Sequence, residues 1–314
     1  MIIITGGAGF IGSNLVHELN SRGHDKLVVV DDLSHGRKFE NIATATIADY
    51  LDLEEFRAWF SADRDLFEKI ERIYHLGACS TTTEWNGRMM LDLNYAYSRD
   101  LIRYCAKREI PIIYASSAAV YGGATAFEES VANEKPINVY AYSKLLLDSY
   151  VRRQRSKIRS QIVGLRYFNV YGPREQHKGK MASVTYHLNQ QLLESGTVKL
   201  FNSSGGFAAG EQCRDFIYVD DAVNTTLWFA DNPHVSGIFN CGTGRAESFN
   251  QLAGAVLDWH GRGTIEYVAF PDTLCGAYQS FTKANMKALH ATGCKLEYRS
   301  VSAGVDRYLD WLNA

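Results

Sequence analysis

The fold is decided at the start of the chain, by Ile2-Ile3-Ile4-Thr5-Gly6-Gly7-Ala8-Gly9-Phe10-Ile11-Gly12-Ser13-Asn14-Leu15-Val16. Three β-branched apolar residues indicate a buried strand, and glycines then follow at every third position. The helical spacing of Ile11, Leu15 and Leu19 indicates that a helix comes next. A strand that turns through glycines into a helix presents backbone N–H groups and a positive helix end to a diphosphate. The stretch therefore predicts a dinucleotide-binding turn.

Each of the three glycines has its own expected task. Gly6 permits the tight turn, Gly9 lets the backbone approach the phosphates, and Gly12 lets the helix pack closely on the strand. A second apolar run, residues 27–30, ends at Asp31, 19 residues after Gly12, where a carboxylate is expected to meet the adenosine ribose. An ordinary glycine-rich loop is the alternative. The order of strand, glycines, helix, strand and acid favours the dinucleotide.

The loop after Asp31 and Asp32 bears on the choice between NAD and NADP. Asp31 alone favours the free 2′-hydroxyl of NAD, whereas Arg37 and Lys38 are cations that the 2′-phosphate of NADP would need. A solvated polar loop explains the same two cations equally well. These residues by themselves leave the choice open.

Composition excludes several classes of protein. A chain of 314 residues suits one large α/β unit, or a main domain with a smaller second one. Its net charge of −2 shows no basic excess, so nucleic acid is not an expected partner. No apolar run reaches the roughly 20 residues of a membrane span, and because the first strand begins at residue 2 we expect no signal peptide. The six cysteines form no CxxC pair, so we expect a cytoplasmic protein with reduced thiols and no metal site.

Further strands are expected where apolar runs recur. Residues 70–76 and 110–115 are such runs, and the segment between them, 89–104, has helical periodicity. Strands that alternate with helices predict a parallel sheet, which binds ligands at the carboxyl ends of its strands. The small residues 77–80 follow one strand and Ser117 ends another. We therefore expect both in the same crevice as the glycine turn.

The run Tyr140-Ala141-Tyr142-Ser143-Lys144 predicts acid–base chemistry. On a helix, Tyr140 and Lys144 share a face one turn apart. An ammonium beside a phenol lowers the pKa of the phenol, which makes it usable as a base near neutrality, and the same lysine can bind a ribose. A structural tyrosine packed on a helix is the alternative. The order of glycine turn, acid, strand-end serine and Tyr-x-x-x-Lys favours catalysis.

These parts together resemble the extended short-chain dehydrogenase/reductases, in the branch that modifies nucleotide-sugars. The resemblance implies a Rossmann-type, doubly wound α/β fold with a smaller C-terminal α/β substrate domain. We expect residues 1–170 to form the NADP-binding domain, with returning segments near 215–240, and residues 171–314 mainly to bind substrate. The resemblance also implies that Tyr140 is the catalytic base, that Ser117 contacts the same hydroxyl, and that Lys144 assists.

Three segments, 80–85, 166–183 and 239–249, more closely resemble the ADP-L-glycero-D-manno-heptose 6-epimerases. That family inverts C6 of ADP-heptose for the lipopolysaccharide core, with tightly held NADP. A sugar dehydratase is disfavoured because Ala118 and Ala119 stand where dehydratases carry acidic residues. The alternatives are another nucleotide-sugar epimerase, such as a UDP-hexose 4-epimerase, and a non-catalytic dinucleotide sensor. A sensor usually lacks the tyrosine or the lysine, and both are present.

Inversion needs acid–base groups on both sides of the reacting carbon, and the resemblance makes Lys178 the second one. A lysine can serve only if desolvation or neighbouring cations depress its pKa, and Arg174, His177 and Lys180 are such neighbours in sequence. A solvated loop lysine or a phosphate contact is the alternative for Lys178.

The resemblance also implies binding residues and an assembly. The expected cofactor-binding residues are Gly6, Gly9, Phe10, Ile11, Gly12, Asp31, Asp32, Lys38, Leu76, Gly77, Ala78, Cys79, Ser80, Asn94, Lys144, Val170 and Lys178. The expected substrate-binding residues are Ser117, Asn169, Lys180, His187, Phe201, Asn202, Ser203, Ser204, Arg214 and Tyr278. The assembly that the family implies is a homopentamer. Departures from the family pattern are Ala277, Leu53, Leu93, Asp32 and a longer loop at 205–213.

Overall fold

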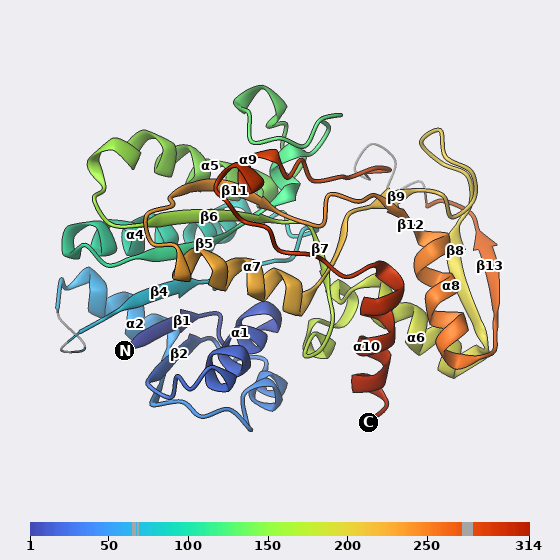
Figure 1. Ribbon diagram of the computed structural model, residues 1–314, viewed down its shortest axis with the longest axis horizontal. Coiled ribbons are helices and arrows are strands. Elements are labelled where there is room, and N and C mark those ends of the chain that lie inside the picture. The colour runs from blue at the N-terminus through green and yellow to red at the C-terminus, as the bar shows by residue number, and fades with distance from the viewer. Residues whose placement is uncertain (65–66, 68, 272–278) are drawn as a thin grey trace. The chain divides into compact units, whose positions relative to one another are not determined.

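The computed structural model describes residues 1–64, 67, 69–271 and 279–314, and its chain forms two compact units (Figure 1). The first unit consists of Met1–Ala124, Glu129–Tyr167 and Val223–Phe239. The second consists of Thr125–Glu128, Phe168–Ala222 and Asn240–Ala314. The segment that returns to the first unit is therefore shorter than the range 215–240 expected from the sequence. That the first unit binds cofactor and the second binds substrate stays a prediction.

The first unit is built on a seven-stranded sheet with the order β11-β6-β5-β4-β1-β2-β3. Its strands are β1 (Ile2–Thr5), β2 (Leu27–Asp31), β3 (Asp49–Asp52), β4 (Arg72–His75), β5 (Ile112–Ser117), β6 (Ile162–Tyr167) and β11 (Gly237–Cys241). Across the sheet, each pair of neighbouring strands in the series β3-β2-β1-β4-β5-β6 is parallel. The strand order reverses between β1 and β4, which creates the switch point where such sheets bind ligands. The predicted doubly wound α/β fold is confirmed.

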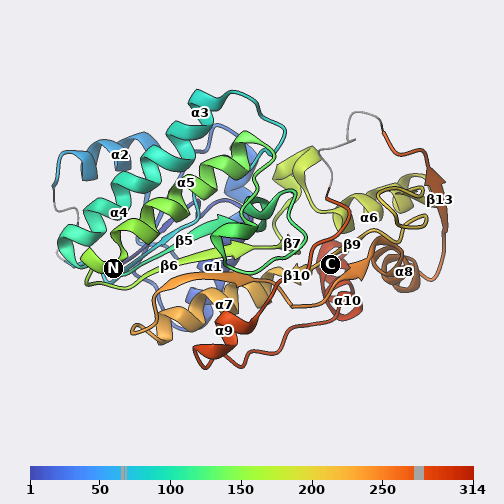
Figure 2. The ribbon, with the colours of Figure 1, turned by 90° about the horizontal axis from the view of Figure 1, so that it is seen from above.

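Helices cover both faces of this sheet (Figure 2). One face carries α2 (Leu53–Ser61), α3 (Gly87–Leu91), α4 (Tyr97–Arg108) and α5 (Val139–Gln154), and the other carries α1 (Phe10–Ser21) and α7 (Val219–Asp231). Strand residues such as Ile3 and Val28 pack with Leu101 and Leu147 in the main core. Because both faces are covered, β1 and β2 are buried at every position, as their continuous apolar sequences predict.

The expected helix over residues 89–104 is interrupted. One turn of π-helix, Asp92–Ala96, lies between α3 and α4. Within it the fully buried Asn94 accepts a hydrogen bond from Cys79 N (2.8 Å) and donates one to Cys79 O (2.9 Å). The wider turn places this amide against the loop that follows β4. Such bulges are frequent at functional sites.

The second unit has its own smaller α/β core. Strands β8 (Thr197–Phe201) and β13 (Thr264–Val268) pair in parallel. Apolar residues such as Leu192, Val198 and Val256 form the core with three helices, α6 (Val184–Ser195), α8 (Phe249–His260) and α10 (Val301–Leu312). Shorter elements are β7 (Asn169–Tyr171), β9 (Cys213–Arg214), β10 (Phe216–Tyr218), β12 (Glu247–Ser248) and α9 (Lys287–Ala291).

Across the described residues, none of the helices is both long and apolar enough to pass through a bilayer.

Candidate active site

The glycine turn between β1 and α1 is closely packed. Gly6 has a φ of +67°, and a Cβ there would lie 2.6 Å from Gly77 N, at the end of β4. A Cβ on Gly12 would lie 2.0 Å from Gly6 O, so the helix packs against the turn itself as well as the strand. Gly9 caps α1 in an extended conformation and has no side chain to cover the helix end. The turn therefore fits a diphosphate placed at the positive end of α1.

We expect Gly12→Ala to disrupt both this turn and nucleotide binding. The added methyl group would overlap a backbone carbonyl, which cannot move without opening the turn. A loss of about 2 kcal/mol in the free energy of unfolding and loss of bound nucleotide are the expected results. Gly254→Ala is the matched control because Gly254 also lies within a helix, and no described atom beyond the adjoining backbone of that helix lies within 4 Å of its Cβ position. Urea unfolding and the nucleotide content of the purified variants measure both effects; equal behaviour of the two variants would contradict the prediction.

The carboxylate at the end of β2 is already engaged. Asp31 Oδ2 accepts the N–H of Ala8 in the glycine turn (2.8 Å), and Oδ1 accepts Lys38 Nζ (2.8 Å). Lys38 Nζ also donates to Asp32 O (2.7 Å), and Asp32 in turn accepts Ser34 N (2.6 Å). The hydrogen bond from Ser34 holds the pKa of Asp32 below its usual value. Asp31, Asp32 and Lys38, which the sequence predicts to contact the cofactor, thus form one hydrogen-bonded cluster.

A buried histidine supports the end of β4. Thr5 Oγ1 accepts the N–H of Gly77 (3.1 Å) and donates to His75 Nδ1 (2.7 Å). Ser98 Oγ donates to Asn94 O (2.7 Å) and lies 2.8 Å from His75 Nε2. These partners assign the ring proton to Nε2. A continuous hydrogen-bonded chain thus joins the glycine turn to the π-helical turn.

The neutral state of His75 makes stability depend on pH. Burial lowers its pKa from 6.5 to about 3. Below about pH 6.5 the unfolded chain therefore takes up a proton that the native protein does not, so stability falls by about 1.4 kcal/mol per pH unit down to about pH 3. We expect His75→Gln to remove this contribution, whereas the exposed His290→Gln should keep it. Urea unfolding at about pH 6, 5 and 4 gives the slopes; identical slopes for both variants would contradict the assignment.

Ser117, Tyr140 and Lys144 are brought together at the end of β5. Ser117 Oγ accepts Ala119 N (3.1 Å) and its side chain is hydrogen-bonded to that of Tyr140. Lys144 is buried on the same helix and its Nζ donates to Ala115 O (2.8 Å). The helical spacing predicted for Tyr140 and Lys144 is found in α5.

The predicted lowering of the Tyr140 pKa is not found. Burial raises the pKa of this phenol, the hydrogen bond with Ser117 lowers it, and the Cys79 thiol raises it. The reason is the position of Lys144, whose ammonium is directed to the Ala115 carbonyl. Burial lowers the pKa of Lys144 itself to about 8, while Asp148 and Cys79 raise it. In this structure Ser117, rather than Lys144, is the group that favours the ionised phenol.

Lys178 belongs to the second unit, in a short 3-10 helix, Gln176–Met181. Burial lowers the pKa of Lys178 and the carboxylate of Glu175 raises it. Of the two causes that the sequence leaves open, desolvation is thus the one that the structure supports. Glu175 is fully buried and accepts Gly172 N (3.3 Å), Ser183 N (2.5 Å) and Ser183 Oγ (2.6 Å). These bonds fix the loop that carries Lys178.

The predicted binding residues divide between the two units. The first unit carries the cofactor residues from Gly6 to Lys144, including Leu76, Gly77, Ala78, Cys79 and Ser80 after β4. The first unit also carries the expected substrate residue Ser117, at the end of β5. The second unit carries the others, which are Asn169, Val170, Lys178, Lys180, His187, Phe201, Asn202, Ser203, Ser204 and Arg214. Tyr278 lies outside the described residues, as does Ala277.

Within the second unit, the loop after β8 carries three of the expected substrate residues, Asn202, Ser203 and Ser204. Gln212 Nε2 donates to Asn202 O (3.0 Å) and Ser204 Oγ (2.8 Å). The backbones of Ser204 and Phe207 form an antiparallel β-bridge. The longer loop at 205–213 is therefore a compact turn. Arg214 donates to Cys213 O (2.9 Å) and its guanidinium lies 5.6 Å from the Phe249 ring centroid. Its role as a diphosphate clamp stays a prediction.

Comparison with known proteins decides the family. The NAD dependent epimerase/dehydratase family matches residues 2–242. The ADP-L-glycero-D-manno-heptose-6-epimerase of Alkalilimnicola ehrlichii is 57% identical over 310 residues, which are 99% of this chain and 97% of that protein. The chain belongs to the ADP-L-glycero-D-manno-heptose-6-epimerases within the NAD dependent epimerase/dehydratase family. The resemblance inferred from the sequence is confirmed.

Solved structures of family members are similar over their whole lengths. The Helicobacter pylori ADP-L-glycero-D-manno-heptose-6-epimerase is 30% identical with a TM-score of 0.86, covering 100% of this chain and 96% of that one. The Thermotoga maritima UDP-glucose 4-epimerase is 26% identical with a TM-score of 0.81, covering 99% and 98%. As an epimerase of this family, the chain is an enzyme that uses a nicotinamide dinucleotide.

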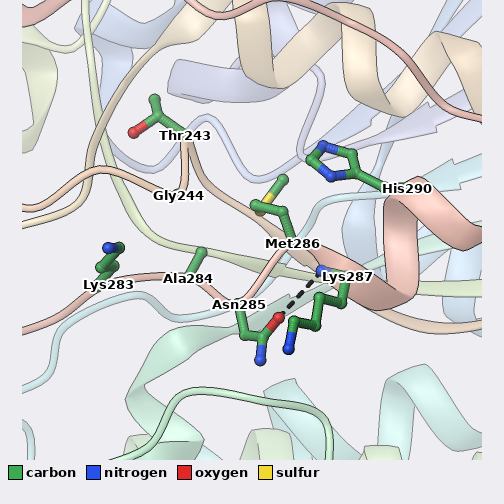
Figure 3. A pocket seen from close by; sticks show the side chains of 8 residues that line it. All are labelled: Thr243, Gly244, Lys283, Ala284, Asn285, Met286, Lys287 and His290. Carbon is green, nitrogen blue, oxygen red and sulfur yellow. Dashed lines mark hydrogen bonds between the residues drawn. The ribbon is translucent and has the colours of Figure 1, made fainter.

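A hollow of about 450 Å³ in the second unit contains none of the residues expected to act in an epimerase (Figure 3). Its lining includes Thr243, Lys283, Lys287 and His290, with Met286 between Thr243 and His290. Thr243 is held by Asp215, which accepts both its N–H (2.7 Å) and its hydroxyl (2.8 Å). The hollow is therefore not where the structure places the chemistry.

Three buried polar residues, His75, Asp148 and Glu175, were not predicted from the sequence. Asp148 could have been noticed, because it follows Lys144 by one helical turn in the printed sequence. His75 gave no such signal, since its partners Thr5 and Ser98 come from other elements, and Glu175 gave none because its partners Gly172 and Ser183 lie in a loop without periodicity.

Proposed function

We propose that this chain epimerises ADP-D-glycero-D-manno-heptose to ADP-L-glycero-D-manno-heptose at C6, in the synthesis of the lipopolysaccharide core precursor. The observation that carries the proposal is the 57% identity over 310 residues to an enzyme with this name. The cluster of Ser117, Tyr140 and Lys144 at the end of β5 supports it, because such a cluster can exchange a proton with a sugar hydroxyl.

Transient oxidation is the chemistry we propose. The C6 carbon loses a hydride and its hydroxyl loses a proton, which gives a ketone; a hydride then returns to C6 on the opposite face and a proton returns to the oxygen. When bound, the nicotinamide dinucleotide takes up the hydride and gives it back. Tyr140 Oη accepts the hydroxyl proton while the Ser117 hydroxyl orients the same oxygen. Lys178 is our candidate for proton exchange on the other face, since desolvation lowers its pKa.

NADP is the cofactor that we propose, with NAD as the alternative. The ion pair between Lys38 and Asp31 offsets a carboxylate that would otherwise repel a 2′-phosphate. The same ammonium provides a positive charge at the end of β2. The glycine turn and the uncapped start of α1 fit the diphosphate of either dinucleotide.

The nucleotide released when the purified protein is denatured tests the cofactor proposal. Chromatography should identify NADP, and recovery of NAD alone would refute the proposal. We further expect Lys38→Ala to weaken NADP binding about tenfold or more while NAD binding is kept. Lys26→Ala is the matched control, because Lys26 is an exposed lysine that stands before Leu27, at the opposite end of β2 from Asp31.

Parallel reactions with ADP-heptose and UDP-galactose, followed by NMR, test the proposed substrate. The proposal expects the L-glycero epimer to accumulate from the ADP-sugar only. Turnover of the UDP-sugar alone would replace it by the 4-epimerase alternative, and turnover of neither would favour a dinucleotide sensor. The cytoplasmic location and the homopentamer stay predictions.

A further inference from the structure

We propose that Asp148 is a positioning residue of this enzyme: its buried carboxylate, one helical turn from Lys144, joins the helix that carries Tyr140 and Lys144 to the strand that ends in Ser117. This inference rests on the proposed function only for its effect on turnover. The contacts that support it all lie within the first unit, where α5 lies along β5 and β6 (Figure 2).

The geometry shows one carboxylate that links three elements. Asp148 is fully buried on α5. Its Oδ1 accepts Tyr114 Oη from β5 (3.0 Å), and its Oδ2 accepts Ser116 Oγ from β5 (2.9 Å) and Arg166 Nε from β6 (2.9 Å). Ser116 immediately precedes Ser117. Loss of the carboxylate would therefore release the strand end on which the catalytic serine stands.

The negative charge of Asp148 also interacts with the ammonium of Lys144. The two residues lie one helical turn apart, and the charge of Asp148 raises the pKa of Lys144 against the burial that lowers it to about 8. The other groups that face Lys144 are the Cys79 thiol, the Ala115 carbonyl and the His75 ring. The groups that face Asp148 from all elements are Lys144, Arg152, Tyr114, Ser116 and Arg166. Since burial disfavours the ammonium, the carboxylate of Asp148 is the first group that sustains it, and Cys79 adds a smaller effect.

Glu134 provides a matched control within the same network. It is ion-paired to Arg166, the arginine that Asp148 also binds, and accepts Arg152 Nη1 (2.6 Å) and Nη2 (2.7 Å). Glu134→Gln thus removes one buried negative charge from Arg166, as Asp148→Asn does. It leaves the carboxylate beside Lys144 and the hydrogen bond from Ser116 in place.

The experiment compares these two variants in the full-length protein by NMR of ¹³C-labelled lysine. Lys144→Met identifies the Lys144 signal by its absence. We expect Asp148→Asn to move the Lys144 titration down by about one pH unit or more, and kcat at about pH 8 to fall at least tenfold relative to Glu134→Gln. Glu134→Gln should titrate like the parent protein. The proposal is overturned if both variants leave the Lys144 titration unchanged or shift it equally.

Ser116→Ala is the second variant, to be used if Asp148→Asn does not fold. It removes one hydrogen-bond donor from the Asp148 carboxylate, so the Lys144 titration should move to higher pH. An unchanged Lys144 titration in this variant would contradict the proposal. The titration does not require turnover. If the protein failed to epimerise ADP-heptose, the proposed function would be rejected. The Lys144 titration in the Asp148 variant would still test the role of Asp148.

Discussion

Tyr140→Phe is expected to lower kcat by about 10³-fold while the protein keeps its nucleotide. The phenyl ring preserves the packing on α5, and the change removes only the hydroxyl that is hydrogen-bonded to Ser117. Without that hydroxyl the proposed base is lost. Because burial raises the Tyr140 pKa, we expect activity to increase with pH until this phenol, assisted by Ser117, ionises.

Tyr142→Phe is the matched control for this prediction. Tyr142 lies on the same helix, two residues away, and its side chain is 46% exposed. The same atom is removed, so a general effect of losing a phenol from α5 would appear in both variants. Steady-state epimerisation and the nucleotide content after purification provide the comparison. Near-parental kcat in Tyr140→Phe would remove Tyr140 from the mechanism.

Lys178→Met is expected to reduce kcat about 10²- to 10⁴-fold in both directions of the reaction. Each epimer needs proton exchange on both faces of the ketone over a full cycle, so loss of either group blocks both directions. Methionine keeps much of the buried aliphatic volume of the lysine. The lowered pKa of Lys178 makes its neutral form accessible at lower pH than an exposed lysine would allow.

Lys180→Met separates acid–base chemistry from binding. Lys180 lies in the same short helix but is expected to contact substrate, so its loss should raise KM more than it lowers kcat. Rates measured at several substrate concentrations and in both directions distinguish the two variants. If Lys178→Met kept its kcat and only KM rose, Lys178 would be a binding residue and a single base would serve both epimers.

What could be predicted from the sequence was local. The strand Ile2–Thr5, the glycine turn and helix α1 follow from spacing within about 20 residues of chain, since side-chain periodicity and glycine placement are local properties. The pair Tyr140 and Lys144 was also found, because helical spacing alone puts both on one face.

What could not be predicted depends on partners distant in sequence. The π-helical turn at Asn94 arises from its hydrogen bonds with Cys79 in another element. Likewise, the expected effect of Lys144 on Tyr140 is absent because the ammonium binds the Ala115 carbonyl of β5. Spacing along a helix shows which side chains are neighbours, but not which acceptor a flexible lysine selects. Burial of Lys178 is a tertiary property for the same reason.

The most direct test of transient oxidation uses ADP-heptose that carries deuterium on C6. If hydride leaves to the bound dinucleotide and returns from it, the deuterium remains on C6 of the inverted product, even in ordinary water. Mass spectrometry and NMR of the product measure this retention. The account predicts nearly complete retention together with inversion at C6. Replacement of the deuterium by solvent hydrogen would contradict it, because that result requires loss of a proton from C6 instead of a hydride.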